Sequence, residues 1–285
     1  MPPKHSPSIT PNTALGGVLH YGVNRVFHRN HPLAAHIEEI YYNGFTIIPN
    51  VLDAETLRSL SDAIDRLYTV QMQELGGVAL AESIYDANNV RCPLAYDDQF
   101  IAIAKHPVMI DLMRAILGDN FVLMMQNAII NRPVEGNYQT RWHRDLNYQH
   151  WTSSQPLTLN ALFCVDPFLF ENGCTHVLPG THLREEFPSD AFVRKYQVPA
   201  LAPAGSVIFM DSMLYHRAGQ NISNKPRRAV NHVIGLPFLA QQIDIPAFVG
   251  DRLATDDFSK NYFGYRWRPA PSAKDWRLAK LPHAK

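Results

Sequence analysis

The chain has few cysteines, no excess of either charge and no long apolar run. Its three cysteines, Cys92, Cys164 and Cys174, are odd in number and form no C-x-x-C pair, so neither a disulfide framework nor a cysteine zinc cage is indicated. Lys+Arg and Asp+Glu both number 26, which argues against a nucleic acid or an anionic membrane as the main partner. No stretch approaches membrane-spanning length, and we expect a cytoplasmic protein without membrane contact.

Motifs for nucleophilic and phosphate chemistry are also missing. The chain has no G-x-S-x-G elbow, no P-loop and no G-x-G-x-x-G fingerprint. None of the cysteines lies in an evidently electropositive segment, which would be needed to activate a thiol. The sequence therefore gives little support to a serine hydrolase, a thiol enzyme or a nucleotide-binding enzyme.

The residues that are present describe a folded chain with two different halves. With 285 residues, 46% hydrophobic and 18% charged, the chain can bury a sizeable core. Apolar residues at helical spacing come first, and short β-rich runs separated by Pro, Gly, Asn and Asp follow. This order predicts an α+β fold with an antiparallel sandwich or barrel. We expect strands at 121–131, 157–166, 174–178, 206–210 and 229–236.

We expect a single domain, residues 1–285, made of four parts. Residues 1–32 lack periodicity and are expected to form an irregular arm. Residues 33–120 are expected to be mainly helical, because they contain two amphipathic segments. Residues 121–240 should form the β core. Residues 241–285 are aromatic and basic, and we expect a C-terminal extension that folds back as a lid or brace.

The segment "TRWHRDLNYQHW", residues 140–151, contains an H-x-D motif. His143 and Asp145 are two positions apart, so in extended chain both side chains point to the same face and can reach one centre. An imidazole and a carboxylate suit divalent iron, manganese or zinc. H-x-D also arises by chance, and a core histidine beside a turn-capping aspartate is the structural alternative.

Two later residues, His216 and Arg227, favour the interpretation as a metal site. His216 follows the apolar run 207–210, and we expect it on a strand that faces back across the barrel. Two histidines and one carboxylate form the facial triad of non-haem iron, although zinc enzymes also use three protein ligands. Arg227 opens the apolar run 229–233 and is suited to hold a carboxylate inside a dry barrel, whereas Arg228 should point the opposite way. His143, Asp145, His216 and Arg227 together indicate an iron site at which a keto acid chelates the metal.

Longer stretches around these residues follow a known pattern. They are "WHRD", "FENGCTHVLPGTH" (170–182) and "DSMLYHRAGQNISNKPRRAV" (211–230). The combination resembles the phytanoyl-CoA dioxygenase (PhyH-like) family of iron(II)- and 2-oxoglutarate-dependent oxygenases, over most of the chain. The resemblance implies a double-stranded β-helix, or cupin-like jelly roll, with N-terminal helices packed on one sheet. It also implies Fe(II) as the metal, with 2-oxoglutarate and O2 as co-substrates.

The resemblance implies roles for individual residues. His143, Asp145 and His216 would bind iron, and Arg227 would anchor 2-oxoglutarate. The halogenating relatives replace the carboxylate of this triad with a small residue, so the presence of Asp145 disfavours halogenation.

Further residues are weaker candidates for the same site. Gln126 matches a position where some members hydrogen-bond the co-substrate, and Thr140 is expected to do the same. The substrate side is expected to include residues close to the H-x-D motif or on the later strands: Tyr148, His150, Trp151, Asn160 and Asn231.

The expected function is hydroxylation, or another oxidation, of an unactivated C–H bond in a small organic metabolite, with release of succinate and carbon dioxide. The protein is expected to be a monomer or homodimer. Two alternatives stay open. A redox-inactive zinc or manganese hydrolase or isomerase would use the same triad without needing Arg227. A non-catalytic module that binds carboxylates would retain the barrel without turnover.

Overall fold

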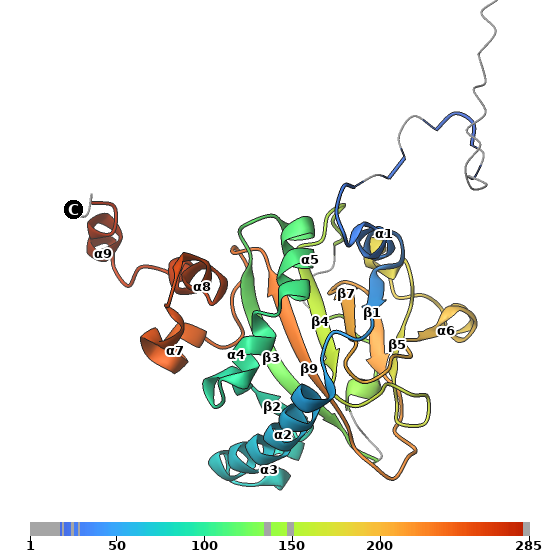
Figure 1. The fold of residues 1–285 in the computed structure, drawn as a ribbon, viewed down its shortest axis with the longest axis horizontal. Helices are drawn as coiled ribbons and strands as arrows, with labels where there is room; N and C mark the ends of the chain where they lie inside the picture. Colours follow the sequence, from blue (N-terminus) through green and yellow to red (C-terminus); the bar gives the residue numbers. More distant parts are fainter. Residues whose placement is uncertain are drawn as a thin grey trace, which may run out of the picture.

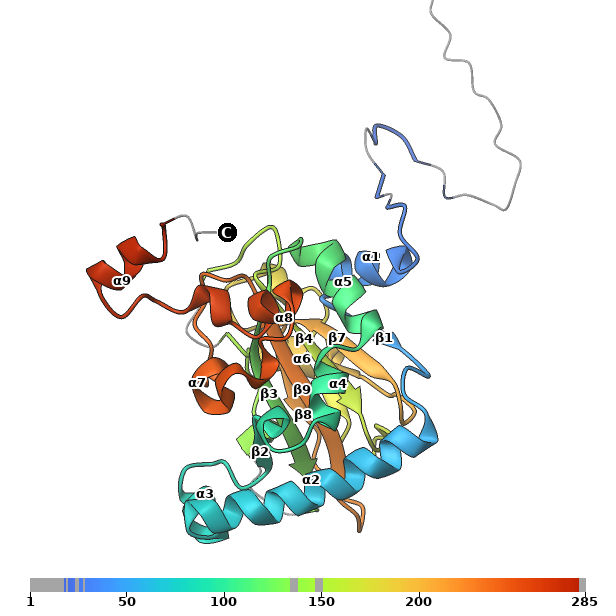
Figure 2. The same ribbon diagram turned by 60° about the vertical axis from the view of Figure 1, so that its left-hand side comes forward.

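The computed structural model describes residues 18, 20–23, 26–27, 29–133, 138–146 and 151–281 (Figures 1 and 2). The α-helices in these ranges are α1 Ala34–Asn43, α2 Ala54–Leu75, α3 Val78–Ser83, α4 Gln99–Ala104, α5 Pro107–Leu117, α6 Asp190–Tyr196, α7 Ile245–Val249, α8 Asp257–Tyr262 and α9 Ala273–Leu278. The strands are β1 Phe45–Ile48, β2 Asn89–Arg91, β3 Val122–Asn131, β4 Thr158–Cys164, β5 Thr175–Val177, β6 Val198–Pro199, β7 Val207–Asp211, β8 His216–Ala218 and β9 Arg227–Gly235.

The strands form two antiparallel sheets. The major sheet has the order β1-β7-β4-β9-β3-β2, and the minor sheet has the order β6-β5-β8. The prediction of an α+β fold with an antiparallel jelly-roll core is confirmed, and each of the five expected strands is present within a few residues as β3, β4, β5, β7 or β9. Strands β2 and β6 were not predicted, because two or three residues are too few to show a period of two. The strand expected to carry His216 is β8.

Both faces of the major sheet are covered. On β9, Val230 and Ile234 pack into the core that the helices share, whereas Ala229 packs on the side of the minor sheet. Strands buried on both faces carry apolar residues at nearly every position, so their sequence does not distinguish one face from the other. The cross-strand register decides which side chains enter the space between the sheets.

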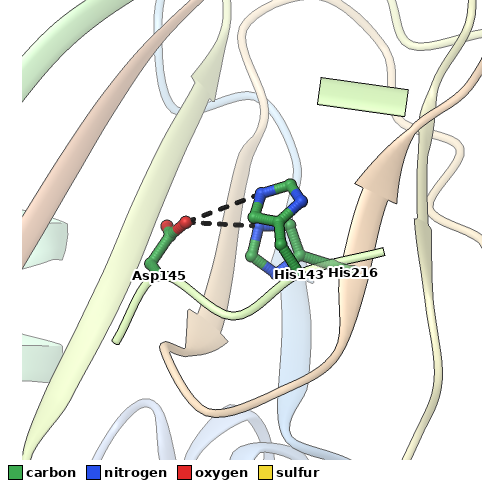
Figure 3. A group of neighbouring side chains, drawn as sticks. All are labelled: His143, Asp145 and His216. Atoms are coloured by element: carbon green, nitrogen blue, oxygen red, sulfur yellow. Dashed lines mark ion pairs between the residues drawn. The ribbon is translucent and has the colours of Figure 1, made fainter. Parts of the chain in front are cut away.

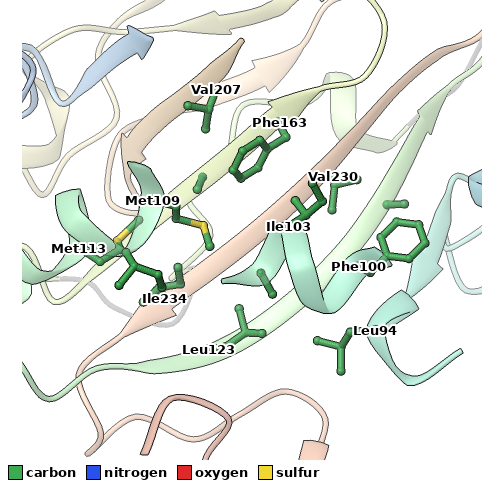
Figure 4. Packing of buried hydrophobic residues seen from close by; sticks show 14 of the residues in the cluster. Leu94, Phe100, Ile103, Met109, Met113, Leu123, Phe163, Val207, Val230 and Ile234 are labelled. Atoms are coloured by element: carbon green, nitrogen blue, oxygen red, sulfur yellow. The ribbon is translucent and has the colours of Figure 1, made fainter. Parts of the chain in front are cut away.

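Helices cover the outer face of the major sheet (Figures 1 and 2). The long helix α2 begins at Asp53, whose carboxylate accepts a hydrogen bond from Thr56 N at 2.8 Å, as an N-cap does. Leu60, Ile64 and Leu67 lie on one face of α2 and are buried, as their helical spacing predicts. Figure 4 shows the packing of α4 and α5 on the strands, with the labelled residues Phe100, Ile103, Met109, Met113, Leu123, Phe163, Val230 and Ile234.

The C-terminal segment contributes to the same core. Tyr262 and Phe263 are buried, and the Tyr262 hydroxyl donates to Ala104 O at 2.7 Å at the end of α4. This part of the tail braces the helical layer, whereas the residues of α9 are exposed at one side of the molecule (Figure 2). None of the helices in the described ranges has the length and apolarity needed to span a bilayer.

Candidate active site

Backbone pairing brings the H-x-D segment against the minor sheet. His143 and His216 form an isolated antiparallel bridge, in which each amide nitrogen donates to the other residue's carbonyl oxygen at 3.0 Å. His216 is the first residue of β8. Directly opposed residues of an antiparallel pair have neighbouring side chains, and the two imidazole centroids are 4.4 Å apart. Two distant parts of the sequence thus present two imidazoles side by side.

Asp145 completes the group (Figure 3). Its Oδ1 lies 3.7 Å from Nε2 of His143 and 3.7 Å from Nε2 of His216. One ligand atom from each of the three residues lies within 4.8 Å of the others. Both imidazoles and the carboxylate converge on one point (Figure 3), as ligands of a single ion must.

The other nitrogen of each ring fixes its tautomer. His143 Nδ1 lies 2.7 Å from Arg141 O, and His216 Nδ1 lies 3.0 Å from Leu214 O. Because a carbonyl oxygen only accepts, each Nδ1 carries the hydrogen, and each Nε2 keeps a lone pair directed at the shared point. Burial lowers the pKa of His216, and the neighbouring His143 lowers it further, which favours the neutral, ligand-competent form.

The carboxylate of Asp145 is oriented from the major sheet. Asn160 on β4 donates through Nδ2 to Asp145 Oδ2, and Ser212 Oγ donates to Asn160 Oδ1 at 2.6 Å. The amide of Asp145 also donates to Ser212 O at 3.0 Å. These contacts engage Oδ2 and leave Oδ1 facing the histidines. Asn160, expected on the substrate side, therefore positions a ligand of the group.

Arg144, between His143 and Asp145, points away from the shared point and is buried. Its Nε donates to Met213 O at 2.7 Å, and Nη1 donates to Glu185 O at 3.1 Å. Nη2 donates to the carbonyls of Thr181, at 2.9 Å, and Arg184. The guanidinium thus ties the H-x-D segment to two other loops.

A cavity of about 310 Å³ lies beside the three residues. Its walls include His143, Asp145 and His216, Arg227 from β9, and polar side chains from β2 and β3. The donor set, two neutral imidazoles and one carboxylate with cavity space beside them, fits divalent iron with open coordination positions.

Arg227 supplies positive charge to this cavity. Its side chain is 3% exposed, and its guanidinium lies 3.9 Å from the centroid of the Phe168 ring. Burial lowers the pKa of Arg227 to about 10, and within the described ranges its Nε has no hydrogen-bond partner. Arg228, one residue along β9, lies on the other face in ion pairs with Asp65 and Asp166, as the strand period predicts.

Gln126 lies outside this cavity, contrary to the expectation that it contacts the co-substrate. Its Oε1 accepts from Leu94 N at 3.0 Å, and its Nε2 donates to Phe100 O and His232 Nε2, both at 2.8 Å. These partners lie on the helical side of the major sheet. The cavity is lined instead by the adjacent Asn127.

Of the remaining residues predicted for the site, some lie at the cavity and others do not. Asn231 is 7% exposed and lines the cavity. Thr140 is half-buried, and its neighbours Tyr138 and Gln139 line the cavity. Trp151 is 54% exposed. Tyr148 and His150 lie outside the described residues.

The sequence interpretation missed several residues of the cavity, namely Arg91, Asn127, Tyr138, Gln139 and Gln242. A period of two from Arg227 and Asn231 identifies the cavity face of β9, but the corresponding face of β3 depends on the pairing of Asn127 with Asn231. That register is not readable from the sequence of either strand alone.

Comparisons with known proteins agree with this geometry. Residues 40–229 match the family described as Phytanoyl-CoA dioxygenase (PhyH). An uncharacterized protein of Mycobacterium tuberculosis is 31% identical over 221 residues, 75% of this chain and 79% of that protein. The peroxisomal phytanoyl-CoA dioxygenase of Homo sapiens is 22% identical over 218 residues, 66% of this chain and 64% of that protein.

The fold is shared with a solved structure. The epimerase SnoN in complex with Fe3+, alpha ketoglutarate and nogalamycin RO aligns with a TM-score of 0.55 and 20% identity, covering 79% of this chain and 91% of that chain. At this identity the likeness concerns the fold. The family match covers more than half of the chain and includes all three converging residues, and it shows that this chain belongs to the phytanoyl-CoA dioxygenase (PhyH) family of iron- and 2-oxoglutarate-dependent dioxygenases.

Proposed function

We propose that this protein is an iron(II)- and 2-oxoglutarate-dependent dioxygenase that oxidises an unactivated C–H bond of a small organic metabolite. One observation carries the proposal: a His-Asp-His group shares a cavity with a buried arginine. A redox-inactive metal site needs the three ligands but has no use for Arg227. An iron site that binds a chelating keto acid needs the three ligands and also Arg227.

His143 and His216 would hold the metal through Nε2, and Asp145 would hold it through Oδ1. The Nδ1 hydrogen bonds of the two histidines to backbone carbonyls fix the orientation of the rings before the metal binds. Bound iron(II) with 2-oxoglutarate and dioxygen supplies the oxidising chemistry, which releases succinate and carbon dioxide. Asn160 keeps the second oxygen of Asp145 away from the metal by donating to it.

Arg227 would bind the far carboxylate of 2-oxoglutarate. A buried cation has lost most of its hydration and gains strongly from an anion that arrives with two acceptor oxygens. In the described part of the chain, Arg227 forms no ion pair, and its guanidinium lies over the face of the Phe168 ring. The structural alternative is a guanidinium that is held by that ring alone.

The test is an anaerobic optical titration of the metal-free protein with iron(II) and then 2-oxoglutarate. We expect a visible metal-to-ligand charge-transfer band in the wild type. The band should be absent in Asp145→Ala and should need at least about tenfold more 2-oxoglutarate in Arg227→Ala, because a bidentate charged contact is lost. Arg228→Gln is the matched control, since it removes a charge one residue along β9 on the opposite face.

The outcomes separate the alternatives. A band of equal strength and affinity in wild type and Arg227→Ala would remove the anchoring role. No band in the wild type, with zinc or manganese bound instead, would favour the redox-inactive enzyme. If the band forms as expected, oxygen-dependent release of succinate on addition of a metabolite would identify the substrate.

A further inference from the structure

Asn231 lines the cavity, and its amide oxygen has no hydrogen-bond donor among the residues that the structure describes. It lies in the middle of β9, four residues from Arg227, on the face that lines the cavity. Its cross-strand neighbours are Asn127 on β3 and Leu162 on β4, both of which also line the cavity. Its backbone lies in a strand that is paired on both sides, so the position of Asn231 in the wall is fixed.

The amide oxygen of Asn231 is buried without a hydrogen-bond partner in the described part of the chain. Asn231 is 7% exposed, and Oδ1 has no hydrogen-bond donor within the described ranges. Leaving a buried polar atom unsatisfied costs about 1–3 kcal/mol, so such atoms in a folded protein call for a reason. A leucine of similar shape would avoid this cost, and leucine already occupies the adjacent register position, Leu162, on β4.

We propose that Asn231 Oδ1 accepts a hydrogen bond from a hydroxyl or N–H group of the substrate. The inference rests on the proposed function. An acceptor needs a donor, and ionised 2-oxoglutarate and dioxygen offer only acceptor atoms. Arg227, which would bind the far carboxylate, lies four strand residues away, about 13 Å between Cα atoms. The donors that are left are water and the molecule that is oxidised, and we assign this acceptor to the oxidised molecule, which would displace the water.

The surrounding wall points to a neutral substrate group. Arg91 lines the cavity beside Asn127, but its charge is already paired with Asp86, at 3.0 Å from Nε to Oδ1. Arg91 Nη1 donates to Gln242 Oε1 at 3.4 Å, and to Asn127 Oδ1 at 2.8 Å in the amide orientation that satisfies both groups. This side of the cavity presents amides and a neutralised arginine, which match hydroxyl groups better than a carboxylate or an ammonium group.

The substrate class that this wall fits is a neutral, hydroxyl-bearing small molecule. The test uses two probes with the same ring and configuration, methyl α-D-glucopyranoside and its fully O-methylated ether. The ether has no hydroxyl donors and is larger by four methyl groups, so the preference is compared between wild type and variants. The protein is loaded with zinc(II), as a redox-inert substitute, and with 2-oxoglutarate. Dissociation constants of both probes are then measured by NMR titration for wild type, Asn231→Leu and Asn231→Asp.

We expect the wild type to bind the glucoside at least about tenfold more tightly than the ether, since one satisfied buried acceptor is worth about that factor. Asn231→Leu should lose this preference, and Asn231→Asp should keep it, because aspartate retains an acceptor oxygen in the same place. Equal binding of the two probes, tighter binding of the ether, or an unchanged preference in Asn231→Leu would overturn the inference.

Two further outcomes are distinguishable. If the loaded wild type binds neither probe, the substrate class is wrong while the proposed function stands. If the wild type takes up neither metal nor 2-oxoglutarate, the proposed function itself fails, and this inference fails with it. Thermal melting of both variants checks that a lost preference does not reflect unfolding.

Discussion

Gln126 and Asn127 are neighbours on β3 with opposite roles. Gln126 points toward the helices, where its amide satisfies Leu94 N, Phe100 O and His232, whereas Asn127 points into the cavity. Successive residues of a strand alternate between faces, so a shift of one position exchanges a structural amide for one that can face a ligand.

We predict that Gln126→Leu destabilises the fold without weakening 2-oxoglutarate binding. The change leaves Leu94 N and Phe100 O buried without partners, which should lower the free energy of unfolding by about 3 kcal/mol. Urea unfolding and the optical titration measure the two quantities, with Gln73→Leu on the exposed face of α2 as control. Unchanged stability with lost co-substrate affinity would contradict the placement of Gln126.

At the scale of elements, the three converging residues come from segments with little regular structure. The H-x-D segment contributes a single bridge to the minor sheet, and β8 has three residues. Such short pairings cannot hold ligand atoms in place by themselves. Arg144 compensates for this weakness, since its guanidinium joins the H-x-D segment to the loops at 181–185 and at Met213 and lies over the Tyr215 ring, 3.8 Å from its centroid.

We predict that Arg144→Lys weakens iron(II) binding about tenfold or more, although no ligand is altered. Lysine keeps the charge but lacks the planar fork that reaches several carbonyls at once, and contacts that orient ligands typically contribute 10–100-fold to metal affinity. The control is Arg141→Lys, an exposed position in the same segment. Equal iron affinities in wild type and Arg144→Lys, from the anaerobic titration, would show that the loops hold without this contact.

At the scale of the whole molecule, two buried groups give the stability opposite dependences on pH. Burial lowers the pKa of His232 to about 4 from an unfolded value of 6.5, so the unfolded state binds the proton first and stability falls as pH drops from 6.5 to 4. Burial raises the pKa of Asp211 to about 6 from 3.8, so its carboxylate destabilises the fold above pH 6 and this cost vanishes as pH drops toward 3.8.

We predict that Asp211→Asn stabilises the protein at pH 7.5 and has no advantage at pH 4. The gain at pH 7.5 should approach about 3 kcal/mol, since each unit of pKa shift corresponds to about 1.4 kcal/mol. Asparagine can still accept the hydrogen bond that Asp211 Oδ1 receives from Met213 N at 2.8 Å. Urea unfolding at both pH values is the measurement. A variant that is less stable than wild type at pH 7.5 would refute the buried-carboxylate explanation.

The sequence by itself determined the order of helices and strands, because α2 and the five longer β runs have clear local periods. It also determined the set His143, Asp145, His216 and Arg227, because residue types with a narrow range of chemistry occur there in a recognisable order. The structure brings these four to one cavity.

The tertiary structure alone decided which amides face that cavity. Both faces of the major sheet are buried, so apolar residues on its strands do not mark an inside and an outside. The family resemblance that suggested Gln126 as a co-substrate contact did not show that its side chain faces the helices. The pairing of β3 with β9 places Asn127 opposite Asn231, and the packing of loops gives Asn160 and Arg144 their contacts. These facts depend on contacts between residues far apart in the chain, and no local pattern encodes them.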